Sequence, residues 1–217
     1  LKIKNVSGRR RQISATGYYE LVMGIVRDKY HTHIVTEIDS KSGALFARNP
    51  YNKEFSDRTV FLDVSESTRF VSGDRIEFIG RNGMMASPLA MRRDRLSGKV
   101  GAGMDPCVSM QVKLELDAGQ EKEILFTFGC GTTADDARDI LRRFSGIDAA
   151  HHELENVWEF WKRTLGAVYV ETPDLSINFL VNGWLQYQVI SCRLWGRSGY
   201  YQSGGALGFR DQIGRAS

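Results

Sequence analysis

Met110-Gln111-Val112-Lys113-Leu114-Glu115-Leu116 alternates apolar with polar side chains without interruption. Successive side chains of a β-strand point to opposite faces, so this pattern predicts a strand with one face on a core and one in water, as in an antiparallel sheet. Asp117-Ala118-Gly119-Gln120 is typical of a turn, and Glu123–Phe128 is expected to pair back on the strand before it. The segment therefore predicts an antiparallel β-domain.

The residues before Met110 predict further short strands, because β-branched and aromatic side chains concentrate in them. The expected strands are Ile13–Val26, His31–Ile38, Ala44–Ala47, Thr59–Val64 and Arg75–Ile79. Many short strands separated by turn residues, such as Asp39–Gly43, are typical of a β-sandwich. We therefore assign residues 1–128 to a β-sandwich domain.

At Gly129 helical periodicity replaces alternation. Thr132 or Thr133 can cap a first helix, and a second is expected from about Asp148 to Leu165. Residues 129–171 are accordingly interpreted as a helical linker.

A third helix is expected to open at Thr172-Pro173-Asp174, with Pro173 in its first turn. Its apolar positions form a broad stripe that we expect to be buried: Ile177, Leu180, Val181, Trp184, Leu185 and Val189. One helix cannot bury its own apolar face. Residues 172–217 are therefore interpreted as the start of a larger helical domain.

Composition narrows the function classes. Of the 217 residues 42% are hydrophobic and 25% charged, and the net charge is only +3, which fits a soluble globular protein rather than a nucleic-acid binder. Arg9–Arg11 is better explained as a solvated strand edge than as a site for an anionic polymer. No apolar run approaches the ~20 residues of a membrane span. Cys107, Cys130 and Cys192 lie far apart, which disfavours a disulfide framework and favours a reducing compartment.

Arg197–Gln212, R-S-G-Y-Y-Q-S-G-G-A-L-G-F-R-D-Q, combines glycines with aromatic, amide and charged side chains. Glycine permits sharp turns and a close approach of the backbone to a ligand. Flat aromatic faces suit a pyranose ring, and the polar groups suit its hydroxyls. This segment predicts a sugar-binding site.

Six further motifs, taken in order and with their spacing, carry a specific resemblance. They are Y-Y-E-L-V-M-G from Tyr18, A-R-N-P-Y-N from Ala47, S-G-D-R-I-E-F-I-G-R-N-G from Ser72, G-M-D-P-C from Gly103, T-P-D from Thr172 and W-L-Q-Y-Q from Trp184. With them the chain resembles the cellobiose-phosphorylase family of glycoside phosphorylases (glycoside hydrolase family 94, formerly glycosyltransferase family 36). It is most similar to the branch found in the C-terminal part of cyclic β-1,2-glucan synthases.

The resemblance implies a mainly β fold with helices: a galactose-mutarotase-like β-supersandwich, a helical linker and the first helix of an (α/α)6 barrel. It also implies inverting phosphorolysis or transfer at β-glucosidic bonds, in which one carboxylic acid protonates the leaving oxygen while inorganic phosphate attacks. The family's acid lies beyond residue 217. We therefore assign no catalytic residue in this chain and expect no cofactor apart from phosphate as co-substrate.

The resemblance also suggests binding residues. Arg210 and Asp211 match the family's G-F-R-D and are expected to bind sugar hydroxyls, as a guanidinium fork beside a carboxylate can; a structural salt bridge is the alternative. Tyr201 and Gln202 are expected to line the same pocket. Arg197 is a candidate for phosphate, or else a helix C-terminal cap.

Two features of the β-domain admit simpler explanations. His31 and His33 alternate on one expected strand and could bind a metal, but without an evident third ligand a surface pair is favoured, and no metal is expected. Ser72–Arg75 and Gly80–Gly83 are expected to shape loops, with contact to substrate as the alternative.

The beginning at Leu1 and the departure from the family pattern over Ile213–Ser217 suggest a fragment, inactive alone, that lacks the first strands of the sandwich. Expected partners are a β-glucan or gluco-oligosaccharide, the rest of the parent polypeptide and a second copy, without membrane contact. The expected location is the cytoplasmic side of the inner membrane, as part of a larger membrane protein. A non-catalytic carbohydrate-binding or assembly module is the alternative, and a binder of acidic polymers through Arg9–Arg11 is a third.

Overall fold

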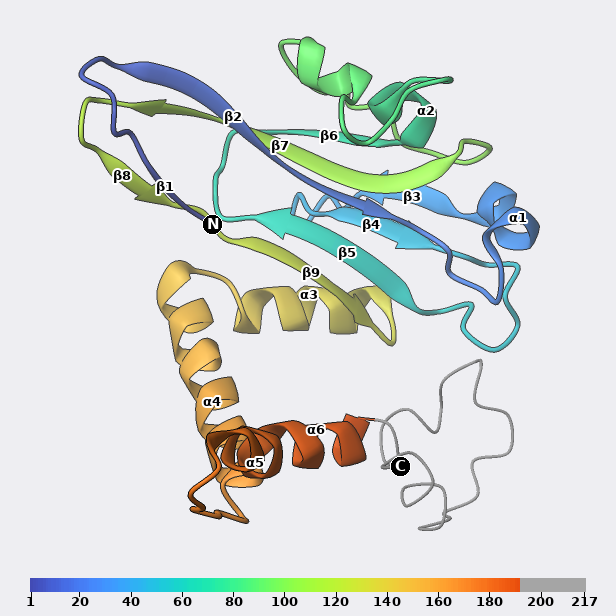
Figure 1. The fold of residues 1–217 in the computed structure, drawn as a ribbon. Coiled ribbons are helices and arrows are strands. Elements are labelled where there is room, and N and C mark those ends of the chain that lie inside the picture. Colours follow the sequence, from blue (N-terminus) through green and yellow to red (C-terminus); the bar gives the residue numbers. More distant parts are fainter. Residues whose placement is uncertain (192–217) are drawn as a thin grey trace. The chain divides into compact units, whose positions relative to one another are not determined.

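The structure is a computed structural model in which residues 1–191 are described (Figure 1). The chain divides into two compact units, Leu1–His151 and His152–Ser217. The first is built on β-strands and the second is helical. Each is described below by itself.

Two antiparallel sheets make up most of the first unit (Figure 1). The three-stranded sheet has the order β2 (Arg11–Glu20), β7 (Pro106–Leu116), β6 (Arg69–Asp74). The four-stranded sheet has the order β3 (Val35–Ile38), β4 (Leu45–Arg48), β5 (Thr59–Val64), β9 (Phe126–Gly131). A separate pair consists of β1 (Lys2–Lys4) and β8 (Glu121–Glu123). The predicted β-sandwich is confirmed.

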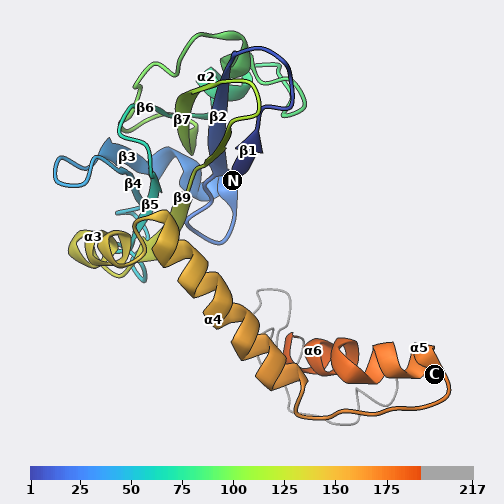
Figure 2. The same cartoon turned by 90° about the vertical axis from the view of Figure 1, so that its left-hand side faces the viewer.

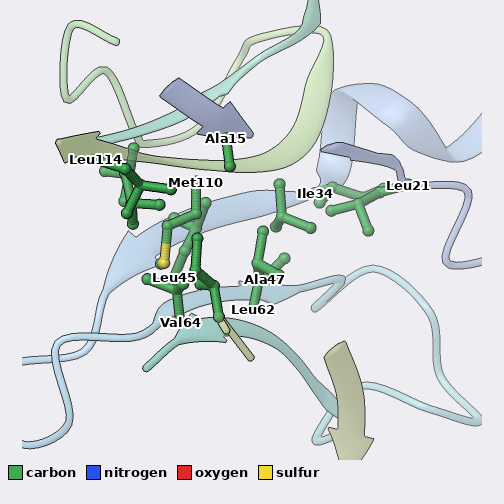
Figure 3. Packing of buried hydrophobic residues seen from close by; sticks show 13 residues of the cluster. Ala15, Leu21, Ile34, Leu45, Ala47, Leu62, Val64, Met110 and Leu114 are labelled. Atoms are coloured by element: carbon green, nitrogen blue, oxygen red, sulfur yellow. The ribbon is translucent and has the colours of Figure 1, made fainter. Parts of the chain in front are cut away.

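The main core lies between the two sheets (Figure 3). The alternating residues of β7 supply Met110, Val112 and Leu114, all buried. On the opposite face Lys113 and Glu115 are exposed as predicted, whereas Gln111 is buried and accepts a hydrogen bond from the backbone N–H of Leu96. The alternation in the sequence thus identified the inward face correctly. The remaining buried members of the core are Ala15, Leu21, Ile34, Leu45, Ala47, Leu62, Val64, Val71, Val108 and Ile124.

The outer face of the four-stranded sheet is also covered. Helix α3 (Ala134–Arg143) begins after the N-cap Thr133, whose side chain accepts a hydrogen bond from the backbone N–H of Asp136, one of the two caps that the sequence predicted. It packs Ala137 and Leu141 against Phe46 and Phe61, with Ala44 in the same cluster. Because both faces of the central residues of β4 and β5 are covered, Leu45–Ala47 and Phe61–Leu62 are apolar on both faces.

The outer face of the three-stranded sheet carries a smaller cluster. Helix α2 (Arg75–Ile79) and the 3₁₀ segment η2 (Leu89–Arg92) contribute Phe78, Ile79 and Ala90, which pack with Leu96 and with the partly buried Tyr18 and Phe70. The sequence prediction of a strand over Arg75–Ile79 is therefore wrong. Asp74 accepts a hydrogen bond from the backbone N–H of Ile76 (3.0 Å) and starts a helix, which ends at Gly80 with φ of 97°.

The expected pairing of Glu123–Phe128 with Met110–Leu116 is also wrong. Both edges of β7 are already occupied, by β2 and β6. After the turn, β8 pairs with β1, and β9 crosses to the other sheet and pairs with β5. An alternating pattern predicts a strand and its buried face, but it does not predict which other strand pairs with it.

The segment before β3 is helical rather than extended. Helix α1 (Arg27–Tyr30) runs into the 3₁₀ turn η1 (His31–His33), and only Val35–Ile38 of the expected strand His31–Ile38 is β. The strand expected over Ile13–Val26 likewise ends at Glu20.

The second predicted helix is confirmed as α4 (Ile147–Leu165), which Figure 2 shows as one uninterrupted helix. The third is shorter and broken. It consists of α5 (Leu175–Phe179), the π-helical segment η3 (Leu180–Trp184) and α6 (Leu185–Val189), with non-helical backbone at Asn182 and Gly183. Its N-cap is Asp174, so Pro173 precedes the helix instead of occupying its first turn.

The apolar stripe of this third helix is not buried as expected. Trp184 is 58% exposed, and Ile177, Leu180, Leu185 and Val189 are also exposed. On α4, Leu154, Val157 and Trp158 are exposed as well. Across residues 1–191, no helix combines the length and apolar character needed to cross a bilayer.

Gly73, in the motif that begins at Ser72, lies where the two sheets pack closely, so a substitution there can test that packing. A Cβ at this buried position would lie 2.3 Å from Thr36 Oγ1, which also bonds to the backbone of Gly101. We expect Gly73→Ala to lower the free energy of unfolding by about 1–3 kcal/mol in urea titrations followed by circular dichroism. Gly8→Ala is the matched control, because nothing lies within 4 Å of its added methyl group. Equal stability of the two variants would contradict the described packing.

Candidate functional site

The predicted sugar- and phosphate-binding residues fall outside the residues that the structure describes. Arg197, Tyr201, Gln202, Arg210 and Asp211 all belong to residues 192–217. Their roles stay predictions. The described residues instead show how the other motifs are used.

Three of the β-domain motifs meet at one end of the three-stranded sheet. The motif from Tyr18 ends β2 and the motif from Gly103 begins β7, and the register places Glu20 opposite Cys107. Arg75, from the motif that starts at Ser72, donates its backbone N–H to the carbonyl oxygen of Asp105 (2.7 Å). Segments far apart in the sequence thus share one corner of the fold.

A network of two arginines and two acids ties this corner together. Arg27 Nε lies 2.7 Å from Glu20 Oε1, and the same guanidinium pairs with Asp105. Arg75 Nε lies 3.2 Å from Glu20 Oε1, and its Nη1 lies 3.3 Å from Asp105 Oδ2. The two positive and two negative charges compensate one another, so the network joins the end of β2 and the starts of α1, α2 and β7 rather than offering a free charge to a ligand.

The other reactive side chains at this corner are inert near neutral pH. Burial raises the pKa of the Cys107 thiol to about 12 and that of the Tyr18 hydroxyl to about 12. Ser72 donates from its hydroxyl to Glu77 (2.8 Å), and Asp74 pairs with Lys99 (2.5 Å). The expected loop over Ser72–Arg75 is wrong, because these residues form the end of β6 and the start of α2. Their contacts are structural ones at that junction.

A fourth motif joins through a buried amide. Asn49, 1% exposed, donates from Nδ2 to the carbonyl oxygen of Met23 (2.8 Å) and accepts at Oδ1 from the backbone N–H of Tyr51 (3.2 Å). Met23 has a φ of 40°, a left-handed conformation that costs a non-glycine residue about 1–3 kcal/mol. The motif from Ala47 therefore fixes the turn that ends the motif from Tyr18.

The expectation that the two histidines alternate on one strand is wrong. They lie in η1, where His31 directs Nδ1 to the carbonyl oxygen of Arg27 (3.1 Å) and His33 stacks on Tyr51, with ring centroids 4.0 Å apart. No cluster of three or more His, Cys, Asp or Glu side chains suited to a metal occurs in residues 1–191. Arg10 of the basic cluster pairs with Glu115 and Asp117, as a strand-edge residue would.

The helical unit contains a ladder of side-chain amides that the motifs did not predict, although Thr172 and Gln186 belong to two of them. Asn178 accepts from the backbone N–H of Thr172 (2.9 Å) and donates to its carbonyl oxygen (3.1 Å). Asn182 makes the same two bonds to Val170, each 2.7 Å long, and Gln186 donates to the carbonyl oxygen of Val168 (3.2 Å).

The spacing explains this ladder. Four residues of helix and two residues of extended chain advance by similar distances, about 6 Å and 6.6 Å. Amides four residues apart can therefore bond to alternate residues of the chain that leads into α5. The signal was present in the sequence as Asn178, Asn182 and Gln186, each four residues after the last. The ladder holds the entry to the third helix in one register.

Comparison with known proteins agrees with this arrangement. Residues 1–147 match the family model described as "Glycosyl hydrolase 94, supersandwich domain". Residues 160–216 match "Glycosyl hydrolase 94 superfamily, catalytic domain". The sandwich and the helical segment thus match two successive domains of one family of carbohydrate-active enzymes. The chain belongs to the glycosyl hydrolase 94 family.

Relatives support the assignment. The chain is 33% identical over 214 residues to cyclic β-(1,2)-glucan synthase NdvB of Rhizobium meliloti (strain 1021), covering 98% of this chain and 8% of that protein. It is 24% identical to N,N′-diacetylchitobiose phosphorylase of Vibrio proteolyticus, covering 96% of this chain and 27% of the relative. It is 26% identical to cellobionic acid phosphorylase of Neurospora crassa, with 87% and 24% covered. The chain thus spans about a quarter or less of these relatives' length.

Proposed function

We propose that this chain is part of an enzyme that acts on β-glucans, by inverting phosphorolysis or by transfer of β-glucosyl units, in the synthesis or remodelling of cyclic β-1,2-glucan. The observation that carries the proposal is the 33% identity to a cyclic β-(1,2)-glucan synthase over 98% of the chain. The match of residues 160–216 to a catalytic-domain model adds support for chemistry rather than binding alone.

Within this proposal Arg210 and Asp211 bind hydroxyls of the sugar, Tyr201 and Gln202 line the same pocket, and Arg197 binds phosphate. Phosphate is the co-substrate, and no other cofactor takes part. The catalytic acid is supplied by residues other than those of this chain, so the 217-residue chain alone is expected to be inactive.

The exposed apolar residues of the helical unit suggest what surrounds it. Leu180 and Trp184 are exposed and lie in the region that matches the catalytic-domain model. We propose that further helices of an (α/α)6 barrel in the parent polypeptide cover them. In the isolated chain the same surface is expected to drive association of copies. The proposed location is the cytoplasmic side of the inner membrane, with this segment outside the bilayer.

An enzyme that contains residues 1–217 is expected to release glucose 1-phosphate from β-1,2-gluco-oligosaccharides and phosphate. Arg210→Ala is expected to lower kcat/KM by about 10- to 100-fold, the loss typical of a hydrogen bond from a charged group. Arg142→Ala is the matched control, since Arg142 is an exposed arginine on α3 paired with Asp139. Activity of Arg210→Ala equal to that of the control would exclude Arg210 from the site.

A further inference from the structure

One surface of the sandwich carries three aromatic rings outside its core, of which Tyr51 is exposed while Tyr30 and His33 are half-buried. His33 and Tyr51 stack with an interplanar angle of 13°, and Tyr30 lies 6.3 Å from Tyr51, centroid to centroid. Tyr51 nevertheless remains 56% exposed. We call Tyr30, His33 and Tyr51, with the neighbouring Ile25 and Val26, the Tyr51 platform; Figure 1 shows α1 and the β4–β5 loop, which bring its parts together, at one end of the sandwich.

The platform is held in place by the interior. Asn49 bonds to both loops that form it, at Met23 and at Tyr51. A Cβ at Gly24 would lie 2.4 Å from the ring of Tyr30, so the backbone of this loop packs directly on that ring. Ile25 and Val26 follow with 58% and 49% exposure. A strained turn held by a buried amide, yet presenting apolar side chains to solvent, is the combination found at binding surfaces.

Charge around the platform favours a neutral ligand. Arg27 is compensated by Glu20 and Asp105. In the two segments that carry the rings, Asp28 precedes Lys29 and Glu54 follows Lys53, and Lys29 Nζ lies 5.6 Å from the centroid of the Tyr30 ring. These segments thus hold charges of both signs, and such side chains can exchange hydrogen bonds with hydroxyl groups.

We propose that the Tyr51 platform is a glucan-binding surface, on which the exposed face of Tyr51 stacks against a pyranose ring of a β-linked gluco-oligosaccharide. The flat apolar face and the balanced polar surroundings match the two kinds of surface of such a sugar. The identity of the glucan rests on the proposed function.

The test is calorimetry and NMR on the 217-residue chain with a linear β-1,2-linked gluco-oligosaccharide, and with dextran as the comparison sugar. Tyr51→Ala is expected to weaken binding about tenfold, whereas Tyr51→Phe, which keeps the flat ring, binds like the wild type. The matched control is Tyr169→Ala, because Tyr169 is 75% exposed in the helical unit. The ring signals of His33, one of four histidines, shift on addition of glucan, and those of His151 do not.

Three results would overturn the proposal: no binding of the β-glucan by the wild type, equal binding by Tyr51→Ala and Tyr169→Ala, or binding that leaves the His33 signals unmoved. Association of copies through Tyr51 without glucan binding counts as the first of these. A different result would contradict the proposed function without contradicting the platform. If an enzyme containing this chain released no glucose 1-phosphate and transferred no glucosyl units, while Tyr51→Ala still weakened glucan binding about tenfold, the platform would stand and the catalytic assignment would fail.

Discussion

Replacing Phe61 with alanine is expected to lower the free energy of unfolding of the sandwich unit by about 3–5 kcal/mol. Phe61 is 1% exposed on β5, and its ring fills the space between the four-stranded sheet and α3, next to Phe46 and Leu141. The ring also lies over Gly129 of the paired strand, where a Cβ would come within 2.5 Å of it. Truncation removes apolar contacts on both sides and leaves a cavity that neither element can close.

Urea unfolding followed by circular dichroism measures this loss. Phe55→Ala is the matched control, because Phe55 is 44% exposed and its truncation is expected to change stability by no more than about 0.5 kcal/mol. If both variants unfolded at the same urea concentration, α3 would not be packed on the sheet as described.

Replacing Arg138 with methionine is expected to destabilise the same region by leaving a buried carboxylate without its cation. Arg138 Nη2 lies 2.8 Å from Asp39 Oδ1, and Nε lies 3.1 Å from both carboxylate oxygens. Asp39 is 6% exposed and otherwise receives hydrogen bonds from Ser42. Removing one partner of a buried pair leaves the other charge uncompensated. Arg142→Met, which breaks only the exposed pair with Asp139 on the same helix, is expected to lower Tm far less.

The effect of Arg138→Met depends on pH. The Arg138 guanidinium, with help from Ser42, holds the pKa of the Asp39 carboxyl well below its ordinary value. A depressed folded-state pKa contributes stability above the unfolded value of about 3.9, and that contribution is lost as pH falls toward the folded value. The difference in Tm between wild type and Arg138→Met should therefore be full near pH 7 and shrink below about pH 4. A difference that stayed constant across this range would contradict the role given to the pair.

The sequence predicted those parts of the fold that depend on local pattern. The strand Thr59–Val64, the inward face of Met110–Leu116, the cap at Thr133 and the helix ending at Leu165 are found as expected. Each is encoded within a few residues, by alternation, by a capping side chain or by helical periodicity.

The errors have two physical causes. In some segments two local patterns predict different structures. The side chains of Arg75–Ile79 suggested a strand, but Asp74 caps a helix at its start and Gly80 ends it. Others depend on distant residues. The partner of β9 was decided by the occupied edges of β7, and the turn at Met23 by the amide of Asn49 from another loop.

The candidate site divides in the same way. The resemblance placed sugar- and phosphate-binding roles on residues beyond 191, and these stay predictions. The order of the motifs in the chain does not show that they meet at one corner of the β-domain. Nor does it show that their charges are compensated there, or that Tyr51 is exposed on a platform of rings. It follows from the pairing of β2 with β7 and from the contacts of Asn49.

The central claim is that this chain is part of a β-glucan-active enzyme that inverts the anomeric carbon. The most direct measurement is NMR of the products formed by an enzyme containing residues 1–217 from a β-1,2-gluco-oligosaccharide and phosphate. We expect α-glucose 1-phosphate as the first product, or glucans of altered chain length if transfer prevails. Formation of the β-anomer, or an unchanged substrate with an enzyme shown to be folded, would contradict it.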